Sequence, residues 1–270
     1  MFRYGKKVLL FIYAALIIVP LTLVVFTSFK TTQNFYLSPL GFPKPFILQN
    51  YVDMFERAKM FTYFKNSVIV TVSTIAIVLL LASMISYAIM RIKGWKGNLL
   101  YSIFILGMML PAQVNMIPLY GVVSKLGLTN SRIGLILVSS TAFLSVAVFI
   151  IGGFMKTLSN DMIEASSIDG ASEWQIYTRI ALPLSAPAMA TAAIFVFVMV
   201  WNDLLYPLLF ITDNTLKTMP LALLDFQGEY LTNYPMIFAG VLIASIPVVI
   251  AYLFLQKYFV AGMTAGASKG

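Results

Sequence analysis

The chain has 270 residues, of which 60% are hydrophobic and only 10% are charged, and its mean hydropathy is +0.90. This composition is far too apolar for a water-soluble domain and indicates a membrane protein. The 18 Lys and Arg residues, which give a net charge of +8, are spread along the chain and form no basic domain that would indicate nucleic-acid binding. Because the sequence contains no Cys and no His, disulfides, thiolate or imidazole metal sites and His-based catalytic triads are excluded.

The N-terminus is basic and is followed by an apolar run, as in a secretory signal peptide. That run continues to Phe29 without a small-residue cleavage site, so we predict a retained membrane helix. Crossing a hydrocarbon core of about 30 Å takes roughly 20 apolar helical residues. Six windows meet this requirement: residues 8–29, 67–90, 99–120, 133–154, 188–211 and 236–259. Each is a long continuous run, which favours helices over barrel strands of about ten alternating residues.

The predicted fold is therefore an all-α integral membrane protein with six transmembrane helices, in a single transmembrane domain 1–270. An even number of spans places both termini on the same side of the membrane. Basic residues crowd into residues 1–7 and into the short connection 91–96, and such clusters favour the cytoplasmic side. We therefore expect residues 1–7, the loop 155–187 and the tail 260–270 to be cytoplasmic.

Prolines fall inside several predicted spans, and the third span is the most disturbed. Pro111 and Pro118 each remove a backbone hydrogen bond, and Gln113 and Asn115 lie between them in the run PAQVNMIP. Irregular backbone is tolerated at membrane depth where protein or a water-filled cavity covers it. Two interpretations stay open for this span, a kinked packing helix and the wall of a cavity.

The stretch between the fourth and fifth predicted spans, residues 155–187, is too polar to insert and is called the knob below. Its pattern predicts two short helices. The first is expected to stop at Gly170, because glycine readily takes the left-handed conformation of a helix end. Ser172 and Gln175 are spaced as a capping box for the second helix, whose apolar residues share one face until Pro183. The mixed charges of the knob fit a protein surface better than anionic lipid, which indicates a docking element.

The segment EASSIDGASEWQIYTRIALPLSAP, which begins at Glu164, resembles the EAA motif of the membrane subunits of binding-protein-dependent ABC importers. The family pattern is Glu-Ala-Ala, a Gly six residues after the Glu, an Ile ten residues further on, and then Leu-Pro. The matching positions are Glu164, Ala165, Ser166, Gly170, Ile180, Leu182 and Pro183. Ser166 replaces the second Ala, and Ser159 stands where the family often has Pro, which puts fine contacts of the knob in doubt. The flanks PAQVNMIPLYGVVSKLGLTNS, WND and QKYFVAGMTAGASKG are similar to maltose-type carbohydrate permeases with a short cytoplasmic tail.

The resemblance implies that the knob is a coupling helix seated in a cleft of a cytoplasmic ATPase. Closure of two ATPases on ATP would then drive the spans from an inward-facing to an outward-facing state. Glu164 would offer its carboxylate to a basic residue of the ATPase, while Trp174 and Tyr177 would pack the second helix against the span ends. The implied coupling residues are Glu164, Ala165, Ser166, Asp169, Gly170 and Ala171. The alternative is an amphipathic helix that merely lies on lipid.

The C-terminal segment 262–270 is rich in Gly, Ala and Ser, a composition typical of disordered termini. Likeness to the family implies instead that this tail enters the interface of the ATPase dimer. The residues expected to make that contact are Thr264, Ala265 and Gly266.

Asp203 is an ionisable residue well inside a predicted span, and such residues are candidates for function because burying a charge in lipid is costly. Together with Asn115, Trp201 and Asn202 it is compatible with a path for a sugar, whose hydroxyls are met by amides, carboxylates and aromatic faces. The structural alternative is equally open: Trp201 would belong to an interfacial belt, and Asn202 and Asp203 would cap or bridge helices.

The energy source is expected on other chains, because the sequence contains no GxxxxGK(S/T) phosphate-binding loop and no intramembrane series of carboxylates and histidines for proton relay. The prediction is a non-catalytic permease subunit of an ATP-driven carbohydrate importer, most consistent with an oligosaccharide, in a prokaryotic cytoplasmic membrane. It binds no cofactor or metal itself; ATP and Mg belong to two partner ATPase subunits.

The other expected partners are a second permease subunit, an extracytoplasmic solute-binding protein, membrane lipid and the carbohydrate. A permease for a non-sugar solute within the same family is the nearest alternative. A secondary carrier or channel, which would transport without ATP, and a membrane-embedded enzyme are the rivals from other classes. The enzyme is the weaker rival, because no paired intramembrane acids or metal-ligand cluster is found in the sequence.

Overall fold

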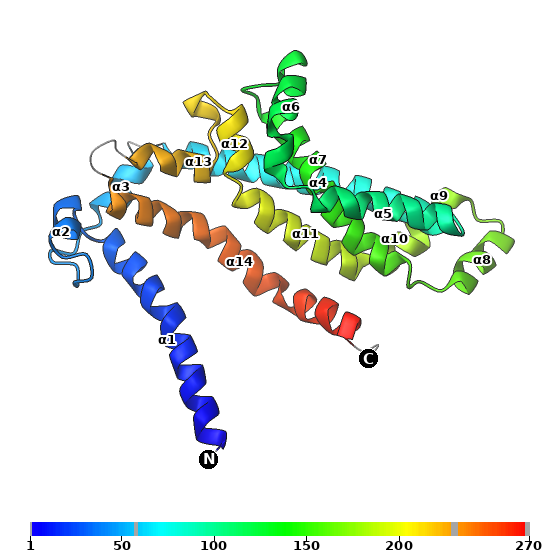
Figure 1. Ribbon diagram of the computed structural model, residues 1–270, viewed down its shortest axis with the longest axis horizontal. Coiled ribbons are helices and arrows are strands. Elements are labelled where there is room, and N and C mark those ends of the chain that lie inside the picture. The colour runs from blue at the N-terminus through cyan, green and yellow to red at the C-terminus, as the bar shows by residue number, and fades with distance from the viewer. Residues whose placement is uncertain (1, 57–58, 228–231, 268–270) are drawn as a thin grey trace. The chain divides into compact units, whose positions relative to one another are not determined.

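The computed structural model describes residues 2–56, 59–227 and 232–267, and over these residues the chain is helical without a strand (Figure 1). Short helices α2 (Thr32–Leu37), α3 (Gln49–Glu56), α8 (Asn160–Ile168), α9 (Glu173–Ile176), α10 (Leu182–Leu184), α12 (Leu205–Phe210) and α13 (Met219–Leu223) alternate with long ones. The long helices are α1 (Phe2–Ser28), α4 (Met60–Arg91), α5 (Trp95–Met109), α6 (Ala112–Lys125), α7 (Arg132–Met155), α11 (Ala186–Trp201) and α14 (Tyr234–Ala267). The predicted all-α fold class is confirmed.

The chain divides into two compact units. Unit 1 consists of Met1–Phe64 and Thr218–Pro247, and unit 2 consists of Lys65–Lys217 and Val248–Gly270. The knob and the elements that border it belong to unit 2.

Among the described residues, four helices are long and apolar enough to cross a membrane by themselves: Lys6–Ser28, Met60–Arg91, Arg132–Met155 and Tyr234–Phe254. Two bent pairs pass the same test when the two helices of each pair are taken together. These pairs are Trp95–Met109 with Ala112–Lys125, bent by 97°, and Glu173–Leu184 with Ala186–Trp201, bent by 72°. Counting each bent pair as one span gives up to six spans, which is the predicted number, although the second pair includes Glu173–Leu184 of the predicted loop 155–187.

The third predicted span, 99–120, is wrong as a continuous helix. Helix α5 ends at Met109, and Leu110 takes an extended conformation (φ −75°, ψ 122°) directly before Pro111. The ring of a proline disfavours the helical conformation of the residue before it, which explains the interruption at this point. Pro118 lies inside α6 without ending it, so only the first of the two prolines breaks the span.

The fifth predicted span, 188–211, is also interrupted. Helix α11 ends at Trp201, and residues 202–204 separate it from the short helix α12. Asp203 accounts for the restart, because its Oδ1 accepts hydrogen bonds from the backbone N–H groups of Leu205 (3.0 Å) and Tyr206 (3.4 Å). These N–H groups at the start of α12 have no intrahelical partner, so the carboxylate acts as a cap.

Helix α7 is the centre of unit 2, where it packs against α5, α11 and α12. Gly152 and Gly153 allow α5 to approach closely: a Cβ on Gly152 would lie 3.0 Å from the ring of Tyr101, and one on Gly153 would lie 3.2 Å from its hydroxyl. The Tyr101 hydroxyl donates to the backbone carbonyl of Phe149 at 2.9 Å. Small residues at a helix contact are the usual means of close packing in membranes, where no hydrophobic force drives helices together.

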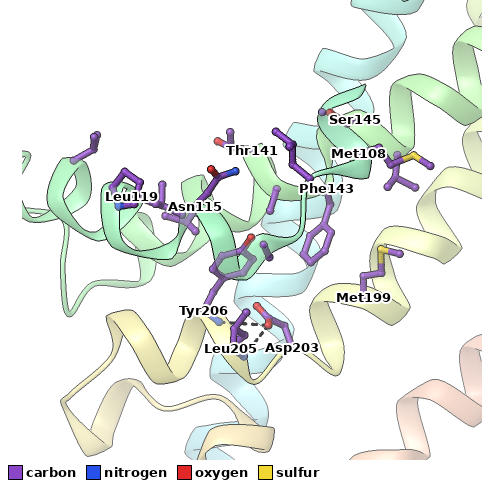
Figure 2. Close-up of a pocket in the computed structure, with 18 residues that line it drawn as sticks. Met108, Asn115, Leu119, Thr141, Phe143, Ser145, Met199, Asp203, Leu205 and Tyr206 are labelled. Atoms are coloured by element: carbon purple, nitrogen blue, oxygen red, sulfur yellow. Dashed lines mark hydrogen bonds between the residues drawn. The ribbon is translucent and has the colours of Figure 1, made fainter. Parts of the chain in front are cut away.

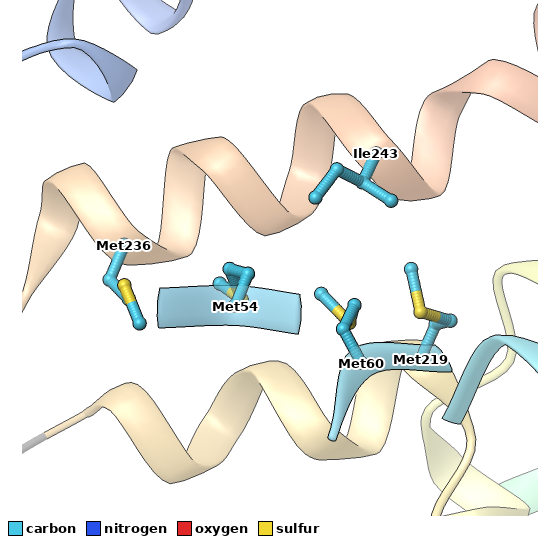
Figure 3. Close-up of a cluster of buried hydrophobic side chains, with 5 residues drawn as sticks. All are labelled: Met54, Met60, Met219, Met236 and Ile243. Atoms are coloured by element: carbon cyan, nitrogen blue, oxygen red, sulfur yellow. The ribbon is translucent and has the colours of Figure 1, made fainter. Parts of the chain in front are cut away.

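The core of unit 1 is a cluster of methionines (Figure 3). Met54, Met60, Met219 and Met236 gather with Ile243, and each of these side chains is buried. Thioether side chains are unbranched and flexible, so they fill irregular space between the short helices and α14.

A buried lysine stabilises the loop that follows α1. The Lys30 side chain is fully buried, and its Nζ donates to the backbone carbonyls of Ser38 (2.8 Å) and Pro39 (3.0 Å). Burial lowers the pKa of Lys30, because desolvation disfavours the charged form. The Asn50 amide donates to the carbonyls of Ser28 and Lys30, both at 2.8 Å, so a side chain of α3 holds the end of α1.

Candidate functional site

The first helix of the knob, α8, ends at Ile168, and Gly170, which was predicted to stop it, follows the C-cap residue Asp169 with a φ of +83°. The Ala171 N–H donates to the Ser166 carbonyl at 3.1 Å, and the Gly170 N–H donates to the Ser167 carbonyl at 3.2 Å. This pair of bonds is the Schellman arrangement, in which a left-handed residue satisfies carbonyls that the helix leaves open. The turn is therefore locally encoded.

The second helix of the knob begins with the predicted capping box. The Ser172 hydroxyl accepts from the Gln175 N–H, and the Gln175 side chain accepts from the Ser172 N–H at 2.8 Å. The helix does not stop at Pro183 as predicted. It passes through a π-helical turn, Tyr177–Ala181, and continues as α10 to Leu184 before the bend at Ser185. Proline is tolerated there because it occupies the first turn of a new helical segment.

Glu164 lies on α8 and is paired with a lysine of its own chain. Its Oε1 is 3.0 Å from Nζ of Lys93, which lies in the connection between α4 and α5. The Lys93 side chain is 83% exposed and that of Glu164 is 55% exposed. Ion pairs in such surroundings contribute about 0–1 kcal/mol, so Lys93 holds Glu164 weakly and leaves its carboxylate available to another cation.

Glu173 makes the strongest polar contacts of the knob, and sequence reasoning missed it. Its carboxylate accepts from Arg91 Nε at 3.0 Å and from the Tyr87 hydroxyl at 2.5 Å, and it also forms an ion pair with the second guanidinium nitrogen of Arg91. These hydrogen bonds, from Arg91 first and then Tyr87, hold the pKa of Glu173 below its ordinary value. Arg91 lies 82 positions before Glu173 in the sequence, and no local pattern predicts that the two residues meet.

The two aromatic residues that the resemblance placed against the span ends behave differently. Tyr177 is buried, and its hydroxyl shares a 2.8 Å hydrogen bond with Ser83 Oγ of α4. Trp174 is 61% exposed, although its ring centroid is 5.3 Å from that of Tyr177. The expected packing is correct for Tyr177 and wrong for Trp174, because the knob contacts α4 through the face that carries Tyr177.

The remaining predicted coupling residues share the outer surface of the knob. Ala165, Asp169 and Gly170 are exposed, while Ser166 and Ala171 are half-buried. Beside them Met162 is 48% exposed and Ile168 is 86% exposed. The knob thus presents apolar and acidic side chains together.

A cavity of about 660 Å³ lies in unit 2 between α5, α6, α7 and the break that follows α11 (Figure 2). Asn115 from α6 and Asp203 from the break both line it, so the structure brings these two predicted residues together. Trp201 and Asn202 are not among the lining residues: Trp201 is buried with its ring stacked on Phe197, and Asn202 donates to the Val198 carbonyl.

The cavity wall combines polar and apolar groups. Sequence reasoning did not identify its other polar members, which are Thr141, Ser145 and Tyr206. The Oδ2 atom of Asp203 is buried without a hydrogen-bond partner among the described residues. An orphaned carboxylate oxygen is costly in a protein interior. The bend at Pro111 places α6 so that Asn115 reaches this wall, which favours the cavity interpretation of the third span.

The predicted tail contacts Thr264, Ala265 and Gly266 lie on the backbone of α14, which continues to Ala267. The C-terminal segment is therefore helical further than its composition indicates. Residues 268–270 of the tail lie outside the described residues. Within the described part of the chain no group of acidic residues is arranged to hold a metal ion.

Comparison with known proteins gives consistent results. Residues 79–265 match the family described as "Binding-protein-dependent transport system inner membrane component". The "Multiple sugar-binding transport system permease protein MsmG" of Streptococcus mutans is 36% identical and covers 98% of this chain and 97% of its own length. The "Trehalose/maltose transport system permease protein MalG" of Thermococcus litoralis is also 36% identical, covering 98% of both chains.

The fold is likewise shared with a solved structure. A chain of a bacterial ABC transporter involved in the import of the acidic polysaccharide alginate superposes with a TM-score of 0.83 at 21% identity, covering 96% of each chain. This likeness concerns the fold.

Proposed function

Because this chain belongs to the family of binding-protein-dependent transport system inner membrane components, we propose that it is a permease subunit of an ATP-driven importer for a carbohydrate, and that this carbohydrate is an oligosaccharide. The observation that carries the proposal is the knob: a locally capped helix–turn–helix with an exposed outer surface, braced against the end of α4. A multi-pass inner-membrane subunit needs such a rigid projection to receive work from a soluble partner.

Two observations support a carbohydrate as the cargo. The relatives described above are named for sugar transport, and they match nearly the whole chain. The cavity of unit 2 offers amide, carboxylate and hydroxyl groups beside apolar walls, which is the lining that neutral, hydroxyl-rich ligands require. Asn115 and Asp203 are the proposed contacts, whereas Trp201 and Asn202 take structural roles.

The proposed assembly contains a second permease, two ATPase subunits that carry ATP and Mg, and an extracytoplasmic solute-binding protein, with the knob and both termini on the cytoplasmic side. The ATPase cleft is proposed to receive the outer surface of α8 and the Gly170 turn, with Glu164 exchanging Lys93 for a basic residue of the ATPase. This exchange costs little, because the Lys93 pair is exposed. The C-terminal turns of α14 would contact the ATPase pair.

The test is uptake of labelled oligosaccharides into proteoliposomes that contain the complete complex and its loaded binding protein. We expect uptake that requires ATP and both ATPase subunits. Uptake that persists without the ATPase would establish a secondary carrier instead. If amino acids or peptides are taken up in an ATP-dependent manner and no oligosaccharide is, the cargo is the non-sugar alternative. That result would overturn the proposal that the cargo is a carbohydrate.

A further inference from the structure

The second helix of the knob is fastened to α4 by side chains at two levels. At the end of α4, the Glu173 carboxylate receives Arg91 and the hydroxyl of Tyr87. Two turns earlier on α4, Ser83 Oγ and the Tyr177 hydroxyl share a buried 2.8 Å hydrogen bond. The rings of Tyr87 and Tyr177 lie between these levels with centroids 5.3 Å apart. One face of α4 thus meets one face of the knob over several residues.

This junction differs from the Lys93–Glu164 pair beside it because it combines a bidentate ion pair with buried tyrosine contacts. Tyr87 and Tyr177 are 8% and 4% exposed, whereas the Arg91 side chain is 30% exposed and that of Glu173 is 60% exposed. Charge-assisted hydrogen bonds from a guanidinium fork fix geometry as well as adding energy, and they weaken less with salt when partly buried. The Lys93–Glu164 pair has a single hydrogen bond and no guanidinium fork, and its cation is 83% exposed where that of the Arg91–Glu173 pair is 30% exposed.

The backbone that connects the knob to α11 is a less direct connection than the side-chain contacts between the knob and α4. The chain between α9 and α11 runs through a π-helical turn and bends by 72° at Ser185. Single π-helical turns interrupt the regular hydrogen-bond ladder of a helix and frequently occur at functional sites. The knob therefore has a direct side-chain connection to α4 and only a bent backbone connection to α11.

We propose that Glu173, Arg91 and Tyr87 form a coupling clamp, a set of positioning residues that makes the membrane-spanning part of α4 within unit 2 move as one body with the knob. This inference rests on the proposed function and deepens it, because it assigns the transmission of work to residues outside the EAA positions. The clamp stays closed throughout the cycle.

The first experiment separates coupling from assembly. The variants E173Q, R91Q and Y87F are placed in the reconstituted complex, with K96Q as matched control, since Lys96 is an exposed cation in the first turn of α5. We expect each clamp variant to copurify with the ATPase subunits but to import at least about fivefold less sugar per ATP hydrolysed. The double variant R91E/E173R, in which the two charges exchange places, should regain at least half of the wild-type ratio of sugar imported to ATP hydrolysed. Wild-type ratios in E173Q and R91Q, or an equal loss in K96Q, would overturn the clamp.

The second experiment uses the natural absence of cysteine from this chain. The variant R91C/E173C is linked by a short bifunctional methanethiosulfonate reagent, which reduction removes. Because the clamp stays closed, linking should raise import per ATP above that of the unlinked double variant, and reduction should reverse the gain. Import that stops on linking would show that the junction must open and would refute the proposal. Failure of ATP-dependent uptake in the wild-type complex would instead count against the proposed function.

Discussion

Tyr177 and Ser83 share a buried hydrogen bond of 2.8 Å between their hydroxyl oxygens, across 94 residues of sequence. Ser83 also donates to the Leu80 carbonyl at 3.0 Å, so Ser83 is satisfied on α4 when it accepts from Tyr177. This bond joins the second helix of the knob to α4, about two turns before the end of that helix, so the position of the knob depends on tertiary contacts.

Removing that bond should loosen the knob without unfolding the chain. We expect Y177F to lower the free energy of unfolding by about 0.5–1.5 kcal/mol, the usual net value of one hydrogen bond. Y177A should cost about 3–5 kcal/mol, because it also empties the space of a buried ring. Denaturation of the purified chain in mixed micelles measures both values. Equal stability of Y177A and wild type would show that the contact with α4 contributes nothing.

Gly170 should tolerate a side chain that accepts its backbone conformation. A Cβ there would meet nothing within 4 Å, so only the φ of +83° restricts the residue. We expect G170N to couple nearly normally, since Asn adopts left-handed conformations, whereas G170V should distort the turn at a cost of about 1–2 kcal/mol or more and abolish ATPase stimulation. Membrane insertion should be intact in both. Stimulation by the loaded binding protein is the measurement, and normal coupling in G170V would contradict the docking role.

The two partners of the exposed ion pair should respond differently to truncation. If Glu164 docks on the ATPase, E164A should reduce stimulated ATP hydrolysis by at least about tenfold, the effect of losing one partner of an interfacial charge pair. K93A removes the same intrachain pair and should leave stimulation within about twofold, because an exposed pair contributes little. Equal losses in E164A and K93A would indicate that the pair within the chain matters and not the partner.

Substitution of Asp203 tests whether the cavity binds the sugar. In D203N the side-chain oxygen can still accept from the N–H groups of Leu205 and Tyr206, so the start of α12 should persist. If a sugar hydroxyl hydrogen-bonds the carboxylate, D203N should weaken the binding free energy of the sugar by about 1.5–3 kcal/mol. Sugar uptake should then fall by about tenfold or more. Competition between labelled sugars measures rate and preference, with circular dichroism and thermal stability as controls. Unchanged rate and preference would leave Asp203 with its capping role alone.

Local chemistry made the knob predictable. The capping box of Ser172 and Gln175 and the left-handed Gly170 each depend on residues within a few positions, so their structures follow from short-range hydrogen bonds. Proline likewise marked the third span as irregular, although the 97° bend exceeds the kink that one missing hydrogen bond implies. The sequence offered capping by Asp203 as one interpretation, and the structure bears it out, but the apolar window 188–211 gave no sign that the helix is interrupted after Trp201.

The sequence by itself determined that this chain is an α-helical membrane protein with a capped projection, because hydropathy and caps act over one or two helical turns. Only the tertiary structure decided that Asn115 and Asp203 share a cavity, that Trp174 stays exposed, and that Glu173 binds Arg91 and Tyr87. These relationships join residues tens of positions apart. Their geometry depends on how α4, α7 and the bent helices pack, and no local interaction specifies that packing.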